Sequence, residues 1–310
     1  MRCLITGATG FVGRHLVVAL RAAGHDPVGL ARQPAPSDLP LHHADLADVP
    51  ATEAVLRSVR PDWVFHLAGY ANTSRSFKEP AAAWAGNLTA TQGLYEAVAR
   101  SGLRPRILYV SSGLVYGDAG PGEHVFAEVD PLRPASPYAA SKAAADLLSY
   151  QQTRSPGLDV VRVRPFNQIG PGQSDNYAVA RFASQIVAVE RGQAAQVVIR
   201  GDLNGRRDLT DVRDMVRAYI RLLEMGQSGE VYNAGSGRTY RMQEILDRLV
   251  SLAGVPVTVE QRPDPTRAAD TAISRADTRK LREATGWEPG YSLDQTLTDM
   301  LTDWRERVQV

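Results

Sequence analysis

The 310-residue sequence contains one cysteine, no long apolar run and almost no net charge. Cys3 alone cannot form a disulfide within the chain, and its apolar surroundings predict a core residue of a cytoplasmic protein. No run of about 18 apolar residues occurs, and the apolar stretch at the start is too short for a signal peptide. Lysine and arginine total 35 against 34 acidic residues. We therefore expect a soluble, untargeted protein with no basic field for nucleic acid or anionic membranes, in which any anion is bound locally.

Metal-ligand patterns are also missing. His42 and His43 would point to opposite faces of a strand, and no other group of His, Cys, Asp or Glu has ligand spacing, so we predict no metal site. No internal repeat or low-complexity tract occurs. What the chain has is a composition of 44% hydrophobic and 22% charged residues, which suits one large core with an appended smaller lobe.

A glycine loop follows the first apolar run. Residues 2–6 predict a buried strand, residues 14–23 predict a helix, and the pattern G-x-x-G-x-x-G lies between them. A tight turn is one explanation, but a glycine loop that opens a helix directly after a strand is typical of dinucleotide binding. The residues predicted to contact the cofactor here are Gly7, Thr9, Gly10, Phe11, Val12 and Gly13.

The end of the second predicted strand, residues 27–30, bears on the choice of cofactor. An acidic residue at this point would accept from a ribose 2′-hydroxyl, but the chain has Arg32 there, which with Arg14 favours the 2′-phosphate of NADP over NAD. Two surface arginines are the alternative. Asp45 ends a third short strand, where its carboxylate could bind the adenine amino group or could cap a helix over residues 49–59.

Strands and helices then alternate as expected for a parallel sheet. Strands are predicted at residues 63–69, which include the exit of that strand, at 106–110 and at 159–164. A loop to Pro80 is followed by a predicted long helix that runs through residue 87 to about residue 100. We interpret His66 as a packed residue at a strand end. Ser112 follows the strand at 106–110, and hydroxyls at the carboxyl ends of parallel strands face the ligand crevice.

The alternation weakens after residues 165–173, which are too rich in glycine and proline to predict a strand or a helix. Further helices are predicted at 178–191, 212–224, 242–252 and 293–307, with strands near 197–200, 231–233 and 257–259. We predict an α/β fold: a Rossmann-type doubly wound sheet mainly from residues 1–165 and a smaller mixed lobe for the substrate mainly from 166–310, with interleaved segments. Arginines at 206, 207, 262 and 267 could be surface charges or could clamp a second diphosphate.

Tyr138 and Lys142 lie one helical turn apart in alanine-rich sequence, with Ser136 as a predicted N-cap and Pro137 at the first helical position. A free tyrosine has a pKa near ~10, and a neighbouring ammonium group favours the phenolate. We therefore predict that Lys142 lowers the pKa of Tyr138. An amphipathic helix with one exposed tyrosine and one exposed lysine is the alternative.

These motifs together resemble the extended short-chain dehydrogenase/reductases that act on nucleotide sugars, over nearly the whole chain. The resemblance rests on the glycine loop, Asp45-Leu46, His66-Leu67-Ala68-Gly69, Ser112 before Val115-Tyr116-Gly117, and Tyr138-x-x-x-Lys142. It implies that Asp45, Leu46, Leu67, Ala68 and Gly69 contact the cofactor. Three motifs of the family have counterparts here: R-x-F-N in the segment with Asn167, R-D-x-x-x-V-x-D in the segment with Arg207, and R-x-G-D in the segment with Arg267. The resemblance implies that these three residues bind the substrate diphosphate. Ser76 is a further expected substrate contact.

Family dehydratases carry acidic residues directly after the serine, where this chain has Gly113-Leu114. The stretches 164–175 and 208–214 are most similar to reductases of GDP-linked 4-keto-6-deoxysugars, with departures at Gln168 and Leu209. The resemblance implies that NADPH, or NADH, reduces C4 of GDP-4-keto-6-deoxy-D-mannose to give GDP-D-rhamnose. Tyr138 would protonate the oxygen, Ser112 would hydrogen-bond it, and Lys142 would hold the nicotinamide ribose.

Two other functions use the same fold. An NAD-dependent nucleotide-sugar 4-epimerase would keep its cofactor tightly bound and need no added NADPH. A non-catalytic dinucleotide sensor would often lack the tyrosine or the lysine, both of which are present. The resemblance also implies a homodimer that pairs the helices at 87–100 and 138–150.

Overall fold

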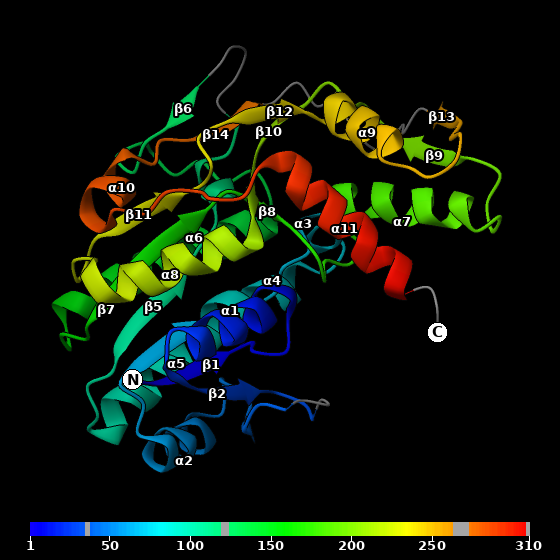
Figure 1. Cartoon of the computed structure of the whole chain (residues 1–310). Coiled ribbons are helices and arrows are strands. Elements are labelled where there is room, and N and C mark those ends of the chain that lie inside the picture. The colour runs from blue at the N-terminus through cyan, green and yellow to red at the C-terminus, as the bar shows by residue number, and fades with distance from the viewer. Residues whose placement is uncertain (35–37, 119–123, 263–272, 308–310) are drawn as a thin grey trace.

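The computed structural model describes residues 1–34, 38–118, 124–262 and 273–307. Its largest element is a seven-stranded sheet in the order β11-β7-β5-β4-β1-β2-β3, in which every paired neighbour is parallel (Figure 1). The strands are β1 (Arg2–Thr6), β2 (Asp26–Ala31), β3 (Leu41–His43), β4 (Trp63–His66), β5 (Arg106–Val110), β7 (Val160–Pro165) and β11 (Val231–Ala234). This order and direction confirm the predicted doubly wound, Rossmann-type fold.

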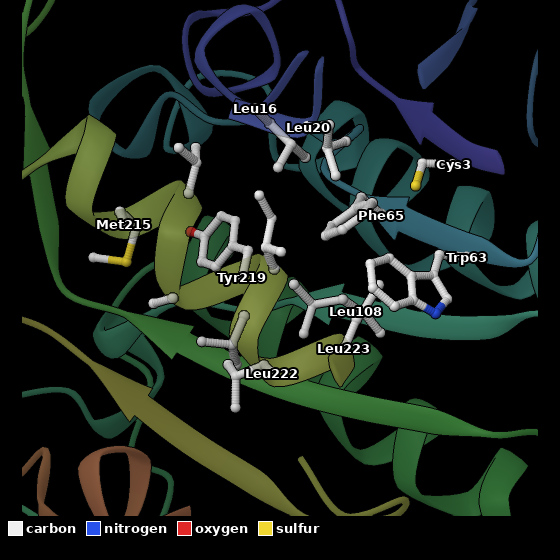
Figure 2. Close-up of a cluster of buried hydrophobic side chains, with 14 of the residues drawn as sticks. Cys3, Leu16, Leu20, Trp63, Phe65, Leu108, Met215, Tyr219, Leu222 and Leu223 are labelled. Atoms are coloured by element: carbon white, nitrogen blue, oxygen red, sulfur yellow. The ribbon is translucent and has the colours of Figure 1, made fainter. Parts of the chain in front are cut away.

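Helices cover both faces of this sheet, so its strands are apolar on both sides. They are α1 (Phe11–Ala22), α2 (Val49–Val59), α5 (Ala90–Ser101), α6 (Pro137–Arg154), α8 (Val212–Met225) and α10 (Arg279–Thr285). Ile5 belongs to a buried cluster with residues of α1 and α8 (Figure 2), whereas its neighbour Leu4 belongs to a second cluster with residues of α2, α5 and α6. Cys3 lies in the first cluster with no exposed surface, which confirms it as a core residue.

The smaller lobe has short strands in two further sheets. One follows the order β12-β10-β14-β6, with β8 also paired to β10, and the other pairs β13 with β9. Its elements are β6 (Val125–Phe126), β8 (Asn167–Ile169), β9 (Val197–Arg200), β10 (Arg206–Asp211), β12 (Thr239–Arg241), β13 (Val259–Arg262), β14 (Ile273–Ala276), α7 (Ala178–Glu190), α9 (Met242–Ser251) and α11 (Leu293–Arg307). Figure 1 shows α7 and α9 on the two sides of the β9–β13 pair, with α11 beside these helices, and the three helices share a hydrophobic core.

The two lobes are interleaved along the chain. Residues 1–165 supply six strands of the large sheet but also β6 of the smaller lobe, and β11 and α8 return from the C-terminal portion to the large sheet. The chain therefore passes from one lobe to the other several times.

Several predicted boundaries moved. Helix α1 begins three residues earlier than predicted, β3 ends before residues 44–46, and β13 lies two residues later than its predicted start. The long helix predicted after the loop to Pro80 is present, but as three consecutive segments: α4 (Pro80–Trp84), a π-helical turn η1 (Ala85–Thr89) and α5. The loop before it also contains a short helix, α3 (Thr73–Ser76), which Asn72 caps by accepting from the Arg75 N–H.

The prediction that residues 165–173 form no regular structure was wrong. Residues Asn167–Ile169 form β8, which pairs in parallel with β10. Gly170 and Pro171 directly follow this strand, so the glycine and proline content ends it after three residues rather than preventing it.

Candidate active site

The glycine loop connects β1 to α1. Gly7 has a φ of +74°, and an added Cβ there would lie 2.9 Å from the Ala68 nitrogen. At Gly13 an added Cβ would lie 2.3 Å from the Gly7 carbonyl oxygen, so the close approach of helix and strand requires glycine. Gly10 precedes α1 without a side-chain cap, which leaves the first-turn N–H groups of this helix to a ligand.

A cleft of about 880 Å³ opens beside this helix start, and both lobes line it. Phe11 and Val12 of α1 line it on one side, and Leu67 and Gly69 after β4 adjoin them. Predicted cofactor residues thus meet predicted catalytic ones, because Ser112, Tyr138 and Lys142 line the same cleft. Thr9 lies in the glycine loop. Ala68, which follows β4, donates its N–H to the hydroxyl of Thr6 at the end of β1.

Tyr138 lies in the first turn of α6. As predicted, Ser136 caps the helix by accepting from the Ala139 N–H at 3.1 Å, and Pro137 is its first residue. Burial raises the pKa of Tyr138 to about 12, while a hydrogen bond with Ser112 acts in the opposite direction. The phenol therefore keeps its proton at neutral pH, as a proton donor requires.

Ser112 follows β5 and caps a 3₁₀ turn, η2 (Gly113–Tyr116). Its hydroxyl accepts a hydrogen bond from the Leu114 N–H at 3.2 Å. Only 7% of its surface is exposed. An added Cβ at Gly113 would lie 2.9 Å from the Phe166 ring, so no side chain fits directly after Ser112. The polar groups that meet at this point of the cleft are thus two hydroxyls, with no carboxylate in the next position.

The predicted effect of Lys142 on Tyr138 was wrong, because burial dominates. The Lys142 ammonium group donates to the Val110 carbonyl oxygen at 2.8 Å and lies over the Tyr109 ring, 5.4 Å from its centre. Burial lowers the pKa of Lys142 to about 8, and the Asp146 carboxylate acts against this shift. Lys142 is therefore held by β5, with its charge supported from the next turn of α6.

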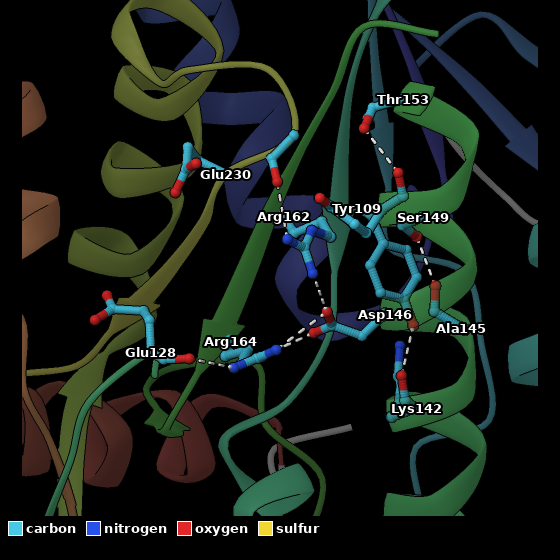
Figure 3. Close-up of polar contacts among 12 residues, drawn as sticks. Tyr109, Glu128, Lys142, Ala145, Asp146, Ser149, Thr153, Arg162, Arg164 and Glu230 are labelled. Carbon is cyan, nitrogen blue, oxygen red and sulfur yellow. Dashed lines mark hydrogen bonds and ion pairs between the residues drawn. The ribbon is translucent and has the colours of Figure 1, made fainter. Parts of the chain in front are cut away.

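Asp146 anchors a buried ion network that sequence reasoning missed. Its carboxylate accepts from Arg162 at 2.7 Å and from Arg164 at 2.9 Å, and all three residues are at most 7% exposed (Figure 3). Arg164 also donates to the Tyr116 hydroxyl at 2.9 Å. The network fastens α6 to β7 and to the turn after Ser112. Asp146 could have been noticed as an acidic residue one turn after Lys142 in an alanine-rich helix.

Asn87 is a second residue that the sequence did not single out. It is 1% exposed, accepts from the Tyr70 N–H at 2.9 Å and donates to the Ser141 hydroxyl at 2.9 Å. Asn87 lies in the π-helical turn η1, which places its side-chain amide between α6 and the loop after β4. Because a π turn has no sequence pattern of its own, this placement is visible only in the fold.

Ser76 is not brought to the cleft wall. It has no exposed surface, donates to the Thr73 carbonyl oxygen at 2.6 Å and accepts from the Tyr138 N–H at 3.2 Å. The short helix α3, which was not predicted, turns its hydroxyl inward. The expected substrate contact is therefore replaced by a contact that holds the backbone of Tyr138.

His66 is packed as predicted, at the end of β4. Its ring nitrogens contact the hydroxyls of Thr6 at 2.8 Å and Thr91 at 2.9 Å, and burial lowers its pKa to about 3. It is therefore neutral and structural.

The residues predicted for the adenosine end lie at the sheet edge beyond the cleft. Arg32 is exposed after β2, and Asp45 and Leu46 follow β3. Asp48, not Asp45, caps α2 by accepting from the Ala51 N–H at 3.0 Å, while Asp45 accepts from the Ala47 N–H. The alternative prediction, that Asp45 caps the helix over residues 49–59, was therefore wrong.

The smaller lobe contributes basic groups to the cleft. Asn167 and Arg207 line it, as expected of diphosphate contacts, and Arg262 lines it as well. Arg206 donates to Thr239 instead, because alternate residues of β10 point to opposite faces. Arg267 lies outside the described residues. The sequence analysis had not singled out Arg181 and Arg200, which also line the cleft.

These residues fit a nicotinamide dinucleotide. The cradle at Gly7 and Gly13 has no room for side chains, the uncapped start of α1 suits a phosphate, and Lys142 reaches the cleft beside Tyr138. Within the described ranges, no group of three or more His, Cys, Asp or Glu residues could hold a metal ion. Over the same ranges, every helix is too short or too polar to span a bilayer.

Comparison with known proteins gives a consistent result. Residues 3–235 match the model of the NAD dependent epimerase/dehydratase family. The chain is 37% identical to GDP-6-deoxy-D-mannose reductase of Pseudomonas aeruginosa, over 99% of this chain and 98% of that protein. It is 31% identical to UDP-glucose 4-epimerase of Mycolicibacterium smegmatis over the full length of both.

Solved structures agree in fold. The structure of RMD from Pseudomonas aeruginosa complexed with NADPH superposes with a TM-score of 0.89 at 35% identity, over 99% of each chain. UDP-glucose 4-epimerase of Thermus thermophilus in complex with NAD gives 0.87 at 29% identity, over 98% of this chain and 99% of that chain. With the glycine cradle, the parallel sheet and the Ser112, Tyr138 and Lys142 cluster in one cleft, the chain belongs to the NAD dependent epimerase/dehydratase family.

Proposed function

We propose that this protein is an NADPH-dependent reductase of a nucleotide-linked 4-keto-6-deoxysugar, converting GDP-4-keto-6-deoxy-D-mannose to GDP-D-rhamnose. The observation that carries the proposal is the meeting of Ser112, Tyr138 and Lys142 in one cleft that both lobes line and that the glycine loop adjoins. Similarity to GDP-6-deoxy-D-mannose reductase over 99% of the chain supports the choice of substrate.

The residues divide the reaction between them. NADPH, when bound, would supply the hydride for C4 of the sugar. As negative charge develops on the C4 oxygen, Tyr138 donates its phenolic proton and Ser112 donates a hydrogen bond, so both stabilise the transition state more than the ketone. Lys142 holds the nicotinamide ribose, and Asn167 and Arg207 hold the substrate diphosphate.

The residues after Ser112 favour reduction over elimination of water. A dehydratase needs an acid and a base beside the sugar, whereas the Gly113 position has no room for a side chain and Leu114 is apolar. NADPH is the proposed cofactor because Arg32, and no acidic residue, follows β2.

A 4-epimerase is the second candidate, because the Mycolicibacterium smegmatis epimerase is 31% identical over the full length. The same tyrosine can remove a proton as hydride leaves C4 and return it afterwards. Such an enzyme retains NAD and works without added NADPH, which distinguishes it from a reductase. A sensor without catalysis is disfavoured by the presence of both Tyr138 and Lys142 in the cleft.

The test is to incubate the protein with GDP-4-keto-6-deoxy-D-mannose and either NADPH or NADH, and to identify the product sugar. We expect NADPH oxidation with formation of GDP-D-rhamnose, and a lower rate with NADH. Consumption of neither cofactor would contradict the proposal, and interconversion of UDP-glucose and UDP-galactose without added cofactor would favour the epimerase.

We also propose a homodimer in which α5 and α6 pair with their copies. Leu147 and Tyr150 lie three residues apart on α6 and are 59% and 39% exposed, which is unusual for large apolar groups on a helix of the core domain. Sedimentation analysis should give a dimer, and Leu147→Glu should give a monomer. A monomeric wild-type protein would refute this assembly.

A further inference from the structure

The cleft wall of the smaller lobe is basic, with one exception. Arg181, Arg200, Arg207 and Arg262 all line the cleft, and Asp202 is the one acidic side chain among the described residues that do so. A carboxylate in a cleft that receives phosphates is repelled by the ligand's own charge. Towards the ligand, its charge is favourable where it meets hydrogen-bond donors of the ligand.

The loop that carries Asp202 is fixed from the side of β13. Gly201 has a φ of +94°, which turns the chain after β9. Its N–H donates to the Arg262 carbonyl oxygen at 3.0 Å, and its own carbonyl oxygen accepts from the Gln261 side chain at 2.9 Å. The residue directly before Asp202 is therefore held at both backbone polar groups.

The same loop is fixed from the side of α9. The Leu203 carbonyl oxygen accepts from the Gln243 N–H at 3.1 Å, and the Gly205 carbonyl oxygen accepts from the Met242 N–H at 3.1 Å. These contacts use N–H groups that the first turn of a helix leaves unpaired. Asp202 is thus presented to the cleft by a short loop that is held at both ends.

The two oxygens of the Asp202 carboxylate have different surroundings. Oδ1 accepts from the Asn204 N–H at 2.9 Å and from the Asn204 side chain at 2.6 Å, and the Arg241 guanidinium in turn donates to Asn204. Oδ2 accepts no hydrogen bond from residues 1–34, 38–118, 124–262 or 273–307. Asparagine would form the same turn through Oδ1, so the turn does not explain the second oxygen or the charge.

The surfaces around Asp202 suit a planar base. Val198, Ile199, Leu203 and Phe182 also line the cleft, and because the last three belong to the core of the smaller lobe, the surface that they leave to the cleft is small and apolar. Guanine presents two adjacent donors on one edge, N1–H and the 2-amino group. Uracil has a single N–H between two carbonyl groups, and adenine has an acceptor at N1, which a carboxylate would repel.

We propose that Asp202 selects the guanine base of the substrate, with Oδ2 accepting hydrogen bonds from N1–H and the 2-amino group. This inference rests on the proposed GDP-sugar function. Asp202 is then a specificity-determining residue in the smaller lobe, remote in sequence from Ser112, Tyr138 and Lys142.

The test compares GDP, IDP, UDP and 2′-deoxy-GDP in calorimetric titrations of the NADPH-saturated protein. IDP lacks only the 2-amino group, so wild-type protein should bind GDP about tenfold more tightly than IDP, as expected for a hydrogen bond to a charged group. Asp202→Asn should lower GDP affinity by about tenfold and remove the difference between GDP and IDP. The turn should survive, because asparagine keeps Oδ1.

Asp48→Asn is the matched control, since it makes the same change at an exposed carboxylate whose Oδ1 caps α2 outside the cleft. It should leave all four affinities unchanged. Equal binding of GDP and IDP by wild-type protein, or an unchanged ratio in Asp202→Asn, would overturn the inference while leaving the reductase proposal intact.

A different pattern would place Asp202 on the ribose. In that case 2′-deoxy-GDP would bind wild-type and Asp202→Asn protein equally, and GDP and IDP would lose affinity together, which also overturns recognition of the base. Failure of wild-type protein to bind GDP more tightly than UDP would count against the GDP-sugar function itself.

Discussion

The large-sheet lobe and the smaller lobe meet at one cleft but are built differently. In the large lobe the proposed catalytic groups stand on long or buried elements: Ser112 follows β5, and Tyr138 and Lys142 lie on α6, which the Asp146 network fastens to β7. In the smaller lobe most of the polar groups that line the cleft stand on strands of three to six residues and on the loops between them, while Arg181 stands on α7. The proposed function would thus place the chemistry in the lobe of long, buried elements and recognition in the lobe whose loops can differ at little cost to the fold.

The comparison predicts that substitutions in the two lobes change different kinetic constants. The largest effect is expected at Tyr138, because it supplies the proton. Tyr138→Phe should lower kcat on the order of 10³-fold and leave the dissociation constant of NADPH nearly unchanged, measured by steady-state kinetics and fluorescence titration.

Tyr150→Phe is a suitable control for Tyr138→Phe, since it removes a phenol hydroxyl from the outer part of the same helix. It should retain wild-type kcat. Wild-type turnover by Tyr138→Phe would refute the proton-donor role and with it the assignment of chemistry to the large lobe.

The second prediction concerns stability. Asp146→Asn should lower the free energy of unfolding by about 3–5 kcal/mol, because it leaves Arg162 and Arg164 buried beside a neutral partner. Asp294→Asn, which breaks an exposed pair with Arg248 in the smaller lobe, should lower it by less than about 1 kcal/mol. Urea denaturation measures both, and equal losses would show that the two lobes are not held differently.

The third prediction concerns the smaller lobe. Arg207→Ala should raise KM for the nucleotide sugar by roughly 30-fold and leave kcat within about twofold, because a lost charge-assisted contact to the diphosphate weakens ground state and transition state alike. Arg206→Ala is the neighbouring control and should leave KM unchanged, since Arg206 donates to Thr239 away from the cleft. A fall in kcat without a rise in KM would place Arg207 in the chemical step instead.

The smallest effect is a pH dependence. Burial holds the pKa of Lys142 near 8, below its ordinary value of 10.5, so the ammonium group loses its proton as the pH rises through about 8. If the positive charge is required, kcat should fall by about tenfold per pH unit above this value. Arg207→Ala should show the same profile, because Lys142 belongs to the other lobe. A kcat that stays constant up to about pH 10 would contradict a requirement for the charge.

The sequence predicted the large lobe better than the smaller one. Strands β1 and β5 match their predicted bounds, and the cap of α6 is Ser136 as predicted, because apolar runs and capping residues act locally. Strand β10 has the sequence RRDLTD, which looks like a charged loop. It forms a strand because β8, β12 and β14 pair with it, and Asp208 is buried where Ser236, Gly237 and Ala276 donate to it.

The site shows the same division. Local patterns predicted Ser112, Tyr138, Lys142 and the glycine loop, and the structure brings them to one cleft, because each depends on a strand end or a single helical turn. The sequence could not decide the direction of the Tyr138 pKa shift, since burial opposes the effect of a neighbouring charge and only packing determines its extent. The sequence also could not show that Ser76 lies away from the cleft wall. Nor could it show that Asp202 lines the cleft beside arginines from three other segments.

The sequence by itself therefore determined the class of fold, the glycine cradle and the residues proposed to carry the chemistry, because these follow from hydrophobic period, turn residues and spacing along one chain segment. Only the tertiary structure decided which polar groups share the cleft, which are buried in pairs and which are left to a ligand. Those outcomes depend on contacts between segments such as α6 and β7 or β9 and β13. The free energy of each contact is set when the two polar groups are buried together and exchange water for one another.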